Sequence, residues 1–278
     1  MLNKQPVIAF IGGGNMTQGL ISGLINSGIN KETLEVSDRN PVKLKEIAKK
    51  WGVRAHTSNL EAIRSADLIV LAVKPKDMHD LVIEIREVLQ TRQPLILSVA
   101  AGIHTNHLEQ WLGFHTAIVR AVPNTPALLG VGATGLYANT LVTEEQKNLS
   151  ESLLRAVGIT AWVNHEHEMD SIAALSSSGP AYFFLIMEAL QQSAEALGLS
   201  NSVARLLTLQ TAYGAARMAL ESNIDLEELK KQVASPDGIT ESALHILEEG
   251  GIRALFNKTL NAAKFRSMEI SHLFDIPH

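Results

Sequence analysis

Three consecutive glycines near the start of the chain, Gly12, Gly13 and Gly14, have the setting of a phosphate-binding turn. The apolar run at residues 7–11 before them has the length of a buried strand. After Asn15 apolar residues recur at helical spacing up to residues 27–28, Ser-Gly, a typical helix end. Such a turn lets the backbone approach a pyrophosphate at the helix N-terminus. The pattern therefore predicts dinucleotide binding. The alternative interpretation is an ordinary strand-to-helix turn that binds no ligand.

Two polar breaks interrupt apolar helical sequence in the second half of the chain. Residues 176–180 read SSSGP and offer hydroxyls, and residues 235–240 read SPDGIT and offer backbone N–H groups and the Thr240 hydroxyl. A helix N-terminus can hold a carboxylate through such donors without Lys or Arg. Ser178, Ser235 and Thr240 are alternatively simple helix caps. Two breaks in a chain with a predicted cofactor crevice favour a substrate site.

The composition is that of a globular protein. The 278 residues suffice for two domains, and 46% of them are hydrophobic. The net charge of −5 gives no general attraction to nucleic acid or anionic membranes, and the absence of cysteine excludes thiolate chemistry. The apolar run at residues 7–11 is too short for a signal peptide, and no stretch approaches a membrane span. These features predict a soluble cytoplasmic protein.

Strand and helix patterns alternate through the first part of the chain and predict a doubly wound parallel sheet of the Rossmann type. From Asp170 onward the strand signal disappears, and only helical patterns follow. The fold class is therefore α/β, with a dinucleotide-binding domain at residues 1–164 and an all-α domain at residues 165–278. Strands are expected at residues 7–11, 33–37, 53–56, 67–73, 95–99, 116–122, 133–138 and 160–163.

The end of the second strand usually meets the adenosine ribose of a bound dinucleotide. An acid there favours a free 2′-hydroxyl, and a nearby Arg favours a 2′-phosphate. The chain has both, Asp38 and Arg39. Ser37, Arg39 and Asn40 can hold a phosphate if Asp38 turns away, which favours NADPH and leaves NADH open. Asp38 and Arg39 are alternatively a solvated pair in a turn.

Small residues follow two further strands, in AVKP at residues 72–75 and VAAG at residues 99–102. They suit a flat cofactor lying close to the backbone, although tight turns alone would explain them. The loop PNTP at residues 123–126 is held rigid by its prolines and displays polar groups such as Asn124.

These motifs together resemble those of pyrroline-5-carboxylate reductases over almost the whole chain. The resemblance rests on FIGGGNM, AVKP, VAAG, PNTPA, LSSSGPAYFF, SPDGIT and HILEEGGIR. Two positions depart from the expected patterns. Asp237 replaces a glycine of the family's SPGG-x-T form, and Thr17 stands where the dinucleotide fingerprint has Gly or Ala.

The resemblance implies hydride transfer from NAD(P)H to the C=N carbon of 1-pyrroline-5-carboxylate, giving proline. It implies a homodimer with interlocked helical halves, and leaves open a larger assembly of dimers. Thr240 would orient the ring nitrogen as the catalytic residue. The substrate-binding set would be Ser235, Gly238, Ile239, Thr240, Ser178 and Asn124. The cofactor-binding set would be Ile11, Gly12, Gly13, Gly14, Asn15, Met16, Ser37, Arg39, Asn40, Asn59, Ala72, Val73, Lys74, Pro75, Ala100 and Ala101.

Three alternatives remain, and the first is an NADP-dependent reductase of a related cyclic imine. A β-hydroxyacid dehydrogenase is expected to carry a catalytic Lys on the helix after the Ser-Gly turn, and residues 181–197 contain none. A catalytically silent NADP-binding protein is kept open by Asp237 and Thr17. No metal site is expected, because His165 and His167 around Glu166 lack the HExxH spacing and read as a solvated turn.

Overall fold

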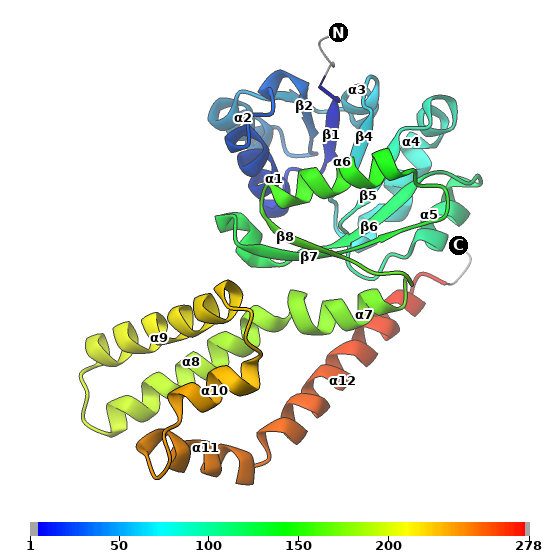
Figure 1. Ribbon diagram of the computed structural model, residues 1–278. Coiled ribbons are helices and arrows are strands. Elements are labelled where there is room, and N and C mark those ends of the chain that lie inside the picture. Colours follow the sequence, from blue (N-terminus) through cyan, green and yellow to red (C-terminus); the bar gives the residue numbers. More distant parts are fainter. Residues whose placement is uncertain (1–4, 276–278) are drawn as a thin grey trace. The chain divides into compact units, whose positions relative to one another are not determined.

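The computed structural model describes residues 5–275. Packing divides the chain into two compact units. The first comprises the chain up to Ser178 and again from Ala263 onward, and the second comprises Gly179–Ala262. The first unit is an α/β domain and the second is entirely helical (Figure 1). The predicted fold class is therefore confirmed.

The first unit is built on an eight-stranded sheet with the order β3-β2-β1-β4-β5-β6-β7-β8. Its strands are β1 (Ile8–Ile11), β2 (Leu34–Ser37), β3 (Arg54–His56), β4 (Leu68–Leu71), β5 (Leu95–Ser98), β6 (Ile118–Val122), β7 (Gly132–Ala138) and β8 (Gly158–Trp162). All neighbours are parallel except β6 and β7. The antiparallel pair departs from the predicted parallel sheet because only the 3₁₀ turn η3 (Thr125–Leu129) joins the two strands, and a parallel crossover needs a longer connection.

Helices cover both faces of this sheet because side chains of a strand point alternately to either side. Phe10 of β1 belongs to the core beneath α1 (Asn15–Asn26), α2 (Pro41–Trp51) and α6 (Glu144–Arg155). Ile11 belongs to the opposite core beneath α3 (Asn59–Ile63), α4 (Met78–Arg92) and α5 (Thr105–Leu112). The 3₁₀ turns η1 (Lys31–Thr33) and η2 (Pro75–Asp77) precede β2 and α4.

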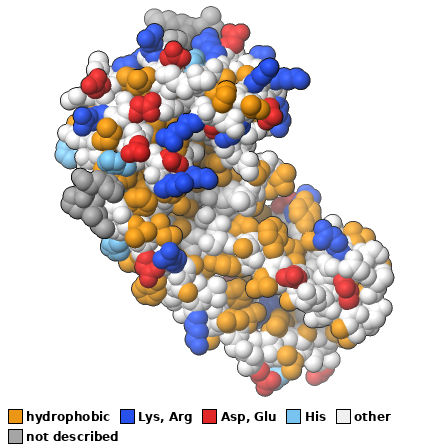
Figure 2. Space-filling model, turned by 180° about the vertical axis from the view of Figure 1, so that it is seen from behind, with side chains coloured by type: hydrophobic (Ala, Val, Ile, Leu, Met, Phe, Trp, Pro, Cys, Tyr) orange, Lys and Arg blue, Asp and Glu red, His pale blue; other side chains and the backbone are white. Residues whose placement is uncertain are grey.

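The second unit contains α8 (Gly179–Ala196), α9 (Asn201–Glu221), α10 (Leu226–Val233), α11 (Ile239–Glu249) and the first part of α12 (Ile252–His272). Of its residues only Gly179 and Ala204 are buried in the single chain. Figure 2 shows hydrophobic side chains gathered on the face of these helices that the view presents. The unit therefore has almost no core of its own.

Two short helical segments lead into this unit. The short helix α7 (Glu168–Ile172) continues as a π turn, η4 (Ala173–Ser177), and a bend at Ser178 separates that turn from α8. The stretch Glu168–Ala196 is long and apolar enough, by length and composition, to cross a membrane. The expectation that no stretch approaches a membrane span is therefore not met by length and composition, a test that an apolar helix packed against protein passes equally.

The packing boundary between the units lies later in the chain than residue 164. Ile172 packs on β7 so closely that a Cβ at Gly135 would lie 2.5 Å from its Cδ1 atom. Asp170 accepts a hydrogen bond of 2.7 Å from Ser267, which lies in the part of α12 that belongs to the first unit. The α7 segment and the C-terminal part of α12 therefore pack with the sheet, although both have helical sequence.

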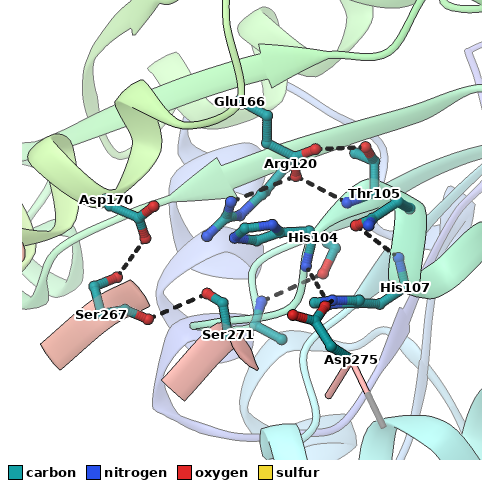
Figure 3. A network of polar contacts seen from close by, with 12 residues as sticks. His104, Thr105, His107, Arg120, Glu166, Asp170, Ser267, Ser271 and Asp275 are labelled. Atoms are coloured by element: carbon teal, nitrogen blue, oxygen red, sulfur yellow. Dashed lines mark hydrogen bonds and ion pairs between the residues drawn. The ribbon is translucent and has the colours of Figure 1, made fainter. Parts of the chain in front are cut away.

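His165 and His167 lie exposed in a turn, as predicted, but the Glu166 carboxylate between them belongs to a buried polar network (Figure 3). Its carboxylate accepts hydrogen bonds from the Thr105 N–H (2.8 Å) and hydroxyl (2.7 Å), and its Oε1 lies 3.4 Å from Nη1 of Arg120. Arg120 is only 1% exposed. Burial lowers the pKa of the Arg120 guanidinium, and the carboxylates of Glu166 and Asp170 oppose that shift. This ion pair leaves no pattern in the sequence, because its partners lie 46 residues apart.

The variant Glu166→Gln should lower the free energy of unfolding by about 2 kcal/mol, because a buried guanidinium loses a charged acceptor. Urea unfolding of the full chain measures this loss. Glu87→Gln, at an exposed position of α4, is the control and should change stability by less than about 0.5 kcal/mol. Equal stability of the two variants would contradict the role given to Glu166.

Candidate functional site

A cleft of about 320 Å³ lies at the carboxyl ends of β1, β2 and β4. This is the edge of an α/β sheet at which ligands bind. Residues of the predicted cofactor set that line the cleft are Ile11, Gly12, Gly14, Ser37, Arg39, Asn59, Ala72, Val73 and Lys74. The other members of that set do not line it, namely Gly13, Asn15, Met16, Asn40, Pro75, Ala100 and Ala101.

Gly12 occupies a place that no larger residue can fill. Its φ is +103°, and a Cβ there would lie 2.7 Å from the carbonyl oxygen of Ala72. Its N–H donates to the Ser37 carbonyl at 2.9 Å, and its own carbonyl accepts from the Thr17 hydroxyl at 2.5 Å. Thr17 therefore closes the glycine turn from within the buried side of α1, which gives a structural reason for a hydroxyl at that position.

Asp38 turns back onto the same turn. Its Oδ2 accepts from the Gly13 N–H at 2.8 Å and from Nζ of Lys43 at 2.5 Å, and its Oδ1 accepts from the Asn40 N–H at 2.9 Å. Burial alone would raise the pKa of the Asp38 carboxyl, but the hydrogen bonds from Lys43, Asn40 and Gly13 outweigh it and lower the pKa. The Gly12 and Gly13 N–H groups are both committed, so the donors left at this turn are those of the first turn of α1.

The predicted polar residues around the ribose position are largely engaged with one another. Ser37 donates to Oδ1 of Asn59 at 2.7 Å, and Nδ2 of Asn59 donates to Glu84 at 2.9 Å. The side chain of Asn40 caps α2. Ser58 caps α3 by accepting from the Glu61 N–H, and Asn59 is the first helical residue.

Four lining residues were missed: Lys43, Lys76, Asp77 and Leu81. Asp77 lies 3.5 Å from Nη1 of Arg39, across the mouth of the cleft. With Arg39 and Lys74, the lysines place four cations against the two carboxylates of Asp38 and Asp77, in a chain whose net charge is −5. Lys76 and Asp77 directly follow the Lys-Pro pair of AVKP, and that adjacency could have indicated them.

Two predicted substrate residues belong to the first unit. The Asn124 amide donates to the Ser176 carbonyl at 3.1 Å and accepts from the Ala133 N–H at 2.9 Å, so it ties η4 to the start of β7. Ser178 lies at the end of η4, half-buried, and its N–H donates to the Ala173 carbonyl at 3.1 Å. The structure thus gives Asn124 a bracing contact and places Ser178 next to the break before α8.

The other predicted substrate residues, Ser235, Gly238, Ile239 and Thr240, belong to the second unit. The Gly238 N–H donates to the Ser235 carbonyl at 3.0 Å, and the Asp237 N–H donates to the Glu241 carboxylate at 2.7 Å. Gly238 is the N-cap of α11, so Thr240 lies in the first helical turn, whose N–H groups have no acceptor within the helix.

Known proteins resemble the chain over nearly its full length. A pyrroline-5-carboxylate reductase of Pseudomonas aeruginosa is 46% identical over 268 residues, covering 96% of this chain and 98% of the relative. The chain belongs to the pyrroline-5-carboxylate reductase family. The resemblance inferred from the motifs is therefore confirmed, as is the assignment to NAD(P)H-dependent oxidoreductases.

Further comparisons agree with this membership. The family model for pyrroline-5-carboxylate reductase dimerisation matches residues 166–270, and that for NADP oxidoreductases, coenzyme F420-dependent, matches residues 7–102. The solved structure of the Coxiella burnetii enzyme has a TM-score of 0.94 and 47% identity, and covers 96% of this chain and 99% of that one. The Plasmodium falciparum enzyme, solved with NADP bound, has a TM-score of 0.83 and 30% identity, and covers 96% and 98%.

The family pattern also explains the backbone at Asp237. Its φ of +56° lies in the left-handed region, which glycine adopts without a steric penalty. The family's glycine at this position therefore has a conformational reason. Asp is among the residues that tolerate this region, and the Glu241 carboxylate stabilises the turn through the Asp237 N–H.

The variant Gly12→Ala should destabilise the ligand-free protein by at least about 2 kcal/mol, because its Cβ meets a backbone carbonyl and the positive φ becomes strained. Gly14→Ala is the matched control. A Cβ at Gly14 meets no atom within 4 Å, so only the loss of a favourable N-cap residue, about 1 kcal/mol or less, is expected. Urea unfolding measures both variants, and equal losses would contradict the close approach at Gly12.

Proposed function

We propose that the protein reduces the C=N bond of 1-pyrroline-5-carboxylate with NADPH, or with NADH, and forms L-proline. The observation that carries the proposal is the match to pyrroline-5-carboxylate reductases across both units of the chain. A cofactor cleft at the carboxyl ends of the strands supports it. Family membership also supports a cytoplasmic location.

The residues of the first unit fit a dinucleotide. A Cβ at Gly12 would collide with the Ala72 carbonyl, whereas a Cβ at Gly14 would meet no atom within 4 Å. The backbone at Gly14 therefore has free space beside it at the start of α1. The Asn15 and Met16 N–H groups at the start of α1 would bind the pyrophosphate. The small residues Ala72 to Pro75, with Ala100 and Ala101, would hold the nicotinamide. The bound cofactor supplies a hydride from its C4 atom.

The loop at residues 235–240 is the proposed carboxylate clamp. The Gly238 N–H is already paired with Ser235, so the Ile239 and Thr240 N–H groups are the better donors to the substrate carboxylate. The Thr240 hydroxyl orients the ring nitrogen. An alcohol is too weak an acid to supply the proton by itself. The substrate therefore binds with its imine nitrogen already protonated, or the nitrogen receives a proton through water. Ser178 and Asn124 complete the proposed substrate set.

We propose a homodimer as the functional state. Phe183, Phe184 and Leu206 of α8 and α9 are about two-thirds exposed in the single chain, and the second unit buries too little apolar surface to be stable alone. A second copy of the chain would cover this surface, including the apolar part of Glu168–Ala196. The match of residues 166–270 to a dimerisation family supports the same occupant.

Sedimentation equilibrium should give a mass of at least twice the 30.2 kDa of one chain. Phe184→Asp should shift the protein to monomer or to aggregate, because a charge enters the apolar surface. Ile83→Asp, at a partly exposed apolar position of α4, should leave the mass unchanged. A monomeric wild type would refute the dimer.

The reductase proposal is tested by steady-state oxidation of NADPH with pyrroline-5-carboxylate, beside NADH. Thr240→Ala should lower kcat/KM by about 10- to 100-fold through lost orientation of the ring nitrogen. Thr240→Ser, which retains the hydroxyl, should recover most of the activity. NADPH binding, followed by its fluorescence, should be the same for all three proteins.

The rival of a silent NADP-binding protein predicts a different result. Wild-type protein would then bind NADPH but never oxidise it with this substrate. In that case Asp237→Gly, which restores the family's glycine and removes an anion from the proposed clamp, becomes the informative variant. Activity gained by this variant would locate the defect at Asp237, and continued silence would support a sensing role.

A further inference from the structure

We propose that the end of α12 positions the loop at residues 99–104 for the nicotinamide, with Asp275 as a positioning residue that acts through His107. This role rests on the proposed use of a nicotinamide dinucleotide and on the proposed place of Ala100 and Ala101 beside its nicotinamide ring. Asp275 does not line the cofactor cleft, so its effect reaches the cofactor through the loop.

The loop follows β5 directly, and α12 packs against its far end. Gly102 is buried and has a φ of +75°. A Cβ at this position would lie 2.6 Å from Cγ2 of Ile270, so α12 lies directly against the loop backbone. Ala100 and Ala101 immediately precede this contact. The position of Ile270 therefore limits where the two alanines can lie.

The ring of His107 joins the end of this loop to the turn after α12 (Figure 3). The His107 side chain is only 1% exposed. Its Nδ1 atom accepts a hydrogen bond of 3.1 Å from the His104 N–H, at the N-cap of α5. Because Nδ1 is an acceptor, Nε2 of the neutral ring carries the proton, and it donates to Oδ1 of Asp275 at 2.6 Å. One ring thus connects the loop backbone to a carboxylate of the C-terminal segment.

Further contacts hold the Asp275 carboxylate in this place. Its Oδ2 atom accepts a hydrogen bond of 2.7 Å from Nδ1 of His272. Hydrogen bonds from His107 and His272 lower the pKa of the Asp275 carboxyl. The ring centroid of Phe274, the preceding residue, lies 6.2 Å from those of His107 and Trp111. The segment is therefore docked on α5 by ring packing as well as by a charged hydrogen bond.

The carboxylate fixes the tautomer of the buried ring. Which nitrogen of a histidine carries the proton is set by the hydrogen bond that the other nitrogen makes. Without Asp275, the buried Nε2–H group of His107 loses its acceptor, and the tautomer with the proton on Nδ1 gains population. That tautomer cannot accept from the His104 N–H. The end of the loop is then released from α5, and the alanines before it lose their fixed position.

Asp275→Leu tests this role in the full-length protein. Fluorescence titration should show about fivefold weaker binding of NADPH, and kcat at saturating NADPH should fall about tenfold through lost orientation of the nicotinamide. Adenosine 2′,5′-bisphosphate lacks the nicotinamide, so its affinity by isothermal titration should stay unchanged. Glu269→Leu is the matched control. It removes the carboxylate of an exposed ion pair of 2.8 Å with Arg266 on the same helix and should change none of these values.

A second variant shows whether Asp275 acts through the tautomer of His107. His107→Gln retains an oxygen that can accept from the His104 N–H, as in a capping box, and has no tautomer to be selected. In this background Asp275→Leu should have little further effect on NADPH binding. A full additional loss would show that Asp275 acts by another route and would overturn the proposal.

Nitrogen NMR of the histidine side chains reads the tautomer directly, at a pH of about 8, above the ordinary pKa of histidine. The wild-type protein should show His107 with its proton on Nε2, and Asp275→Leu should show the Nδ1-protonated form as well. The spectrum of His107→Gln identifies the signal by its absence. The same tautomer in the wild type and in Asp275→Leu would contradict the proposed role.

The two ligands separate the remaining outcomes. Equal weakening of NADPH and of the bisphosphate by Asp275→Leu would show that the segment supports the whole domain, and the positioning role would be wrong. Unchanged binding and kcat in this variant would also overturn the role while leaving the reductase proposal intact. If the wild-type protein binds neither ligand, the proposed cofactor use fails, and the role of Asp275 fails with it.

Discussion

The close crossing of the glycine turn over the end of β4 is the constraint on which the cleft depends. Gly12 lies so near the Ala72 carbonyl that a single methyl group would separate the two strand ends. Hydrogen bonds from the Gly12 N–H to Ser37 and from Thr17 to the Gly12 carbonyl hold the turn in place, and Asp38 fixes Gly13 beside it. The start of α1 is thereby set at the carboxyl edge of the sheet, with its N–H groups free for an anion. This arrangement supports the proposed binding of a pyrophosphate at the start of α1.

Much of the fold could be predicted because the first unit alternates strand and helix with clear changes of period. The β6–β7 pair shows the limit: the pattern gives a strand at residues 133–138 but not its direction, which follows from the short connection η3. The packing of α7 and of the end of α12 could not be read from helical periodicity either. It depends on contacts such as Asp170 with Ser267, whose partners lie 97 residues apart.

The candidate site was predictable where backbone geometry dictates the residue type, as at Gly12 and at the small residues after β4. The site was less predictable where a polar side chain has several possible hydrogen-bond or ion-pair partners. Asp38 was equally compatible with reading a ribose and with a solvated turn, and the structure shows a third role, bracing of Gly13 and Asn40. Asp77 follows the AVKP motif directly, but its role as a partner of Arg39 is visible only in their 3.5 Å contact. In the helical unit, the sequence does not distinguish apolar residues of a core from apolar residues that a protein partner covers. Both kinds of surface have the same composition.

The central claim is that hydride passes from the nicotinamide C4 atom to the imine carbon of pyrroline-5-carboxylate. The most direct test is to supply NADPH deuterated at C4, as each of its two epimers, and to analyse the proline formed by mass spectrometry and NMR. The account predicts that one epimer gives proline with a single deuterium at C5 and that the other gives unlabelled proline. Absence of proline, or unlabelled proline from both epimers, would contradict direct hydride transfer and with it the assignment of this protein as a reductase of the cyclic imine.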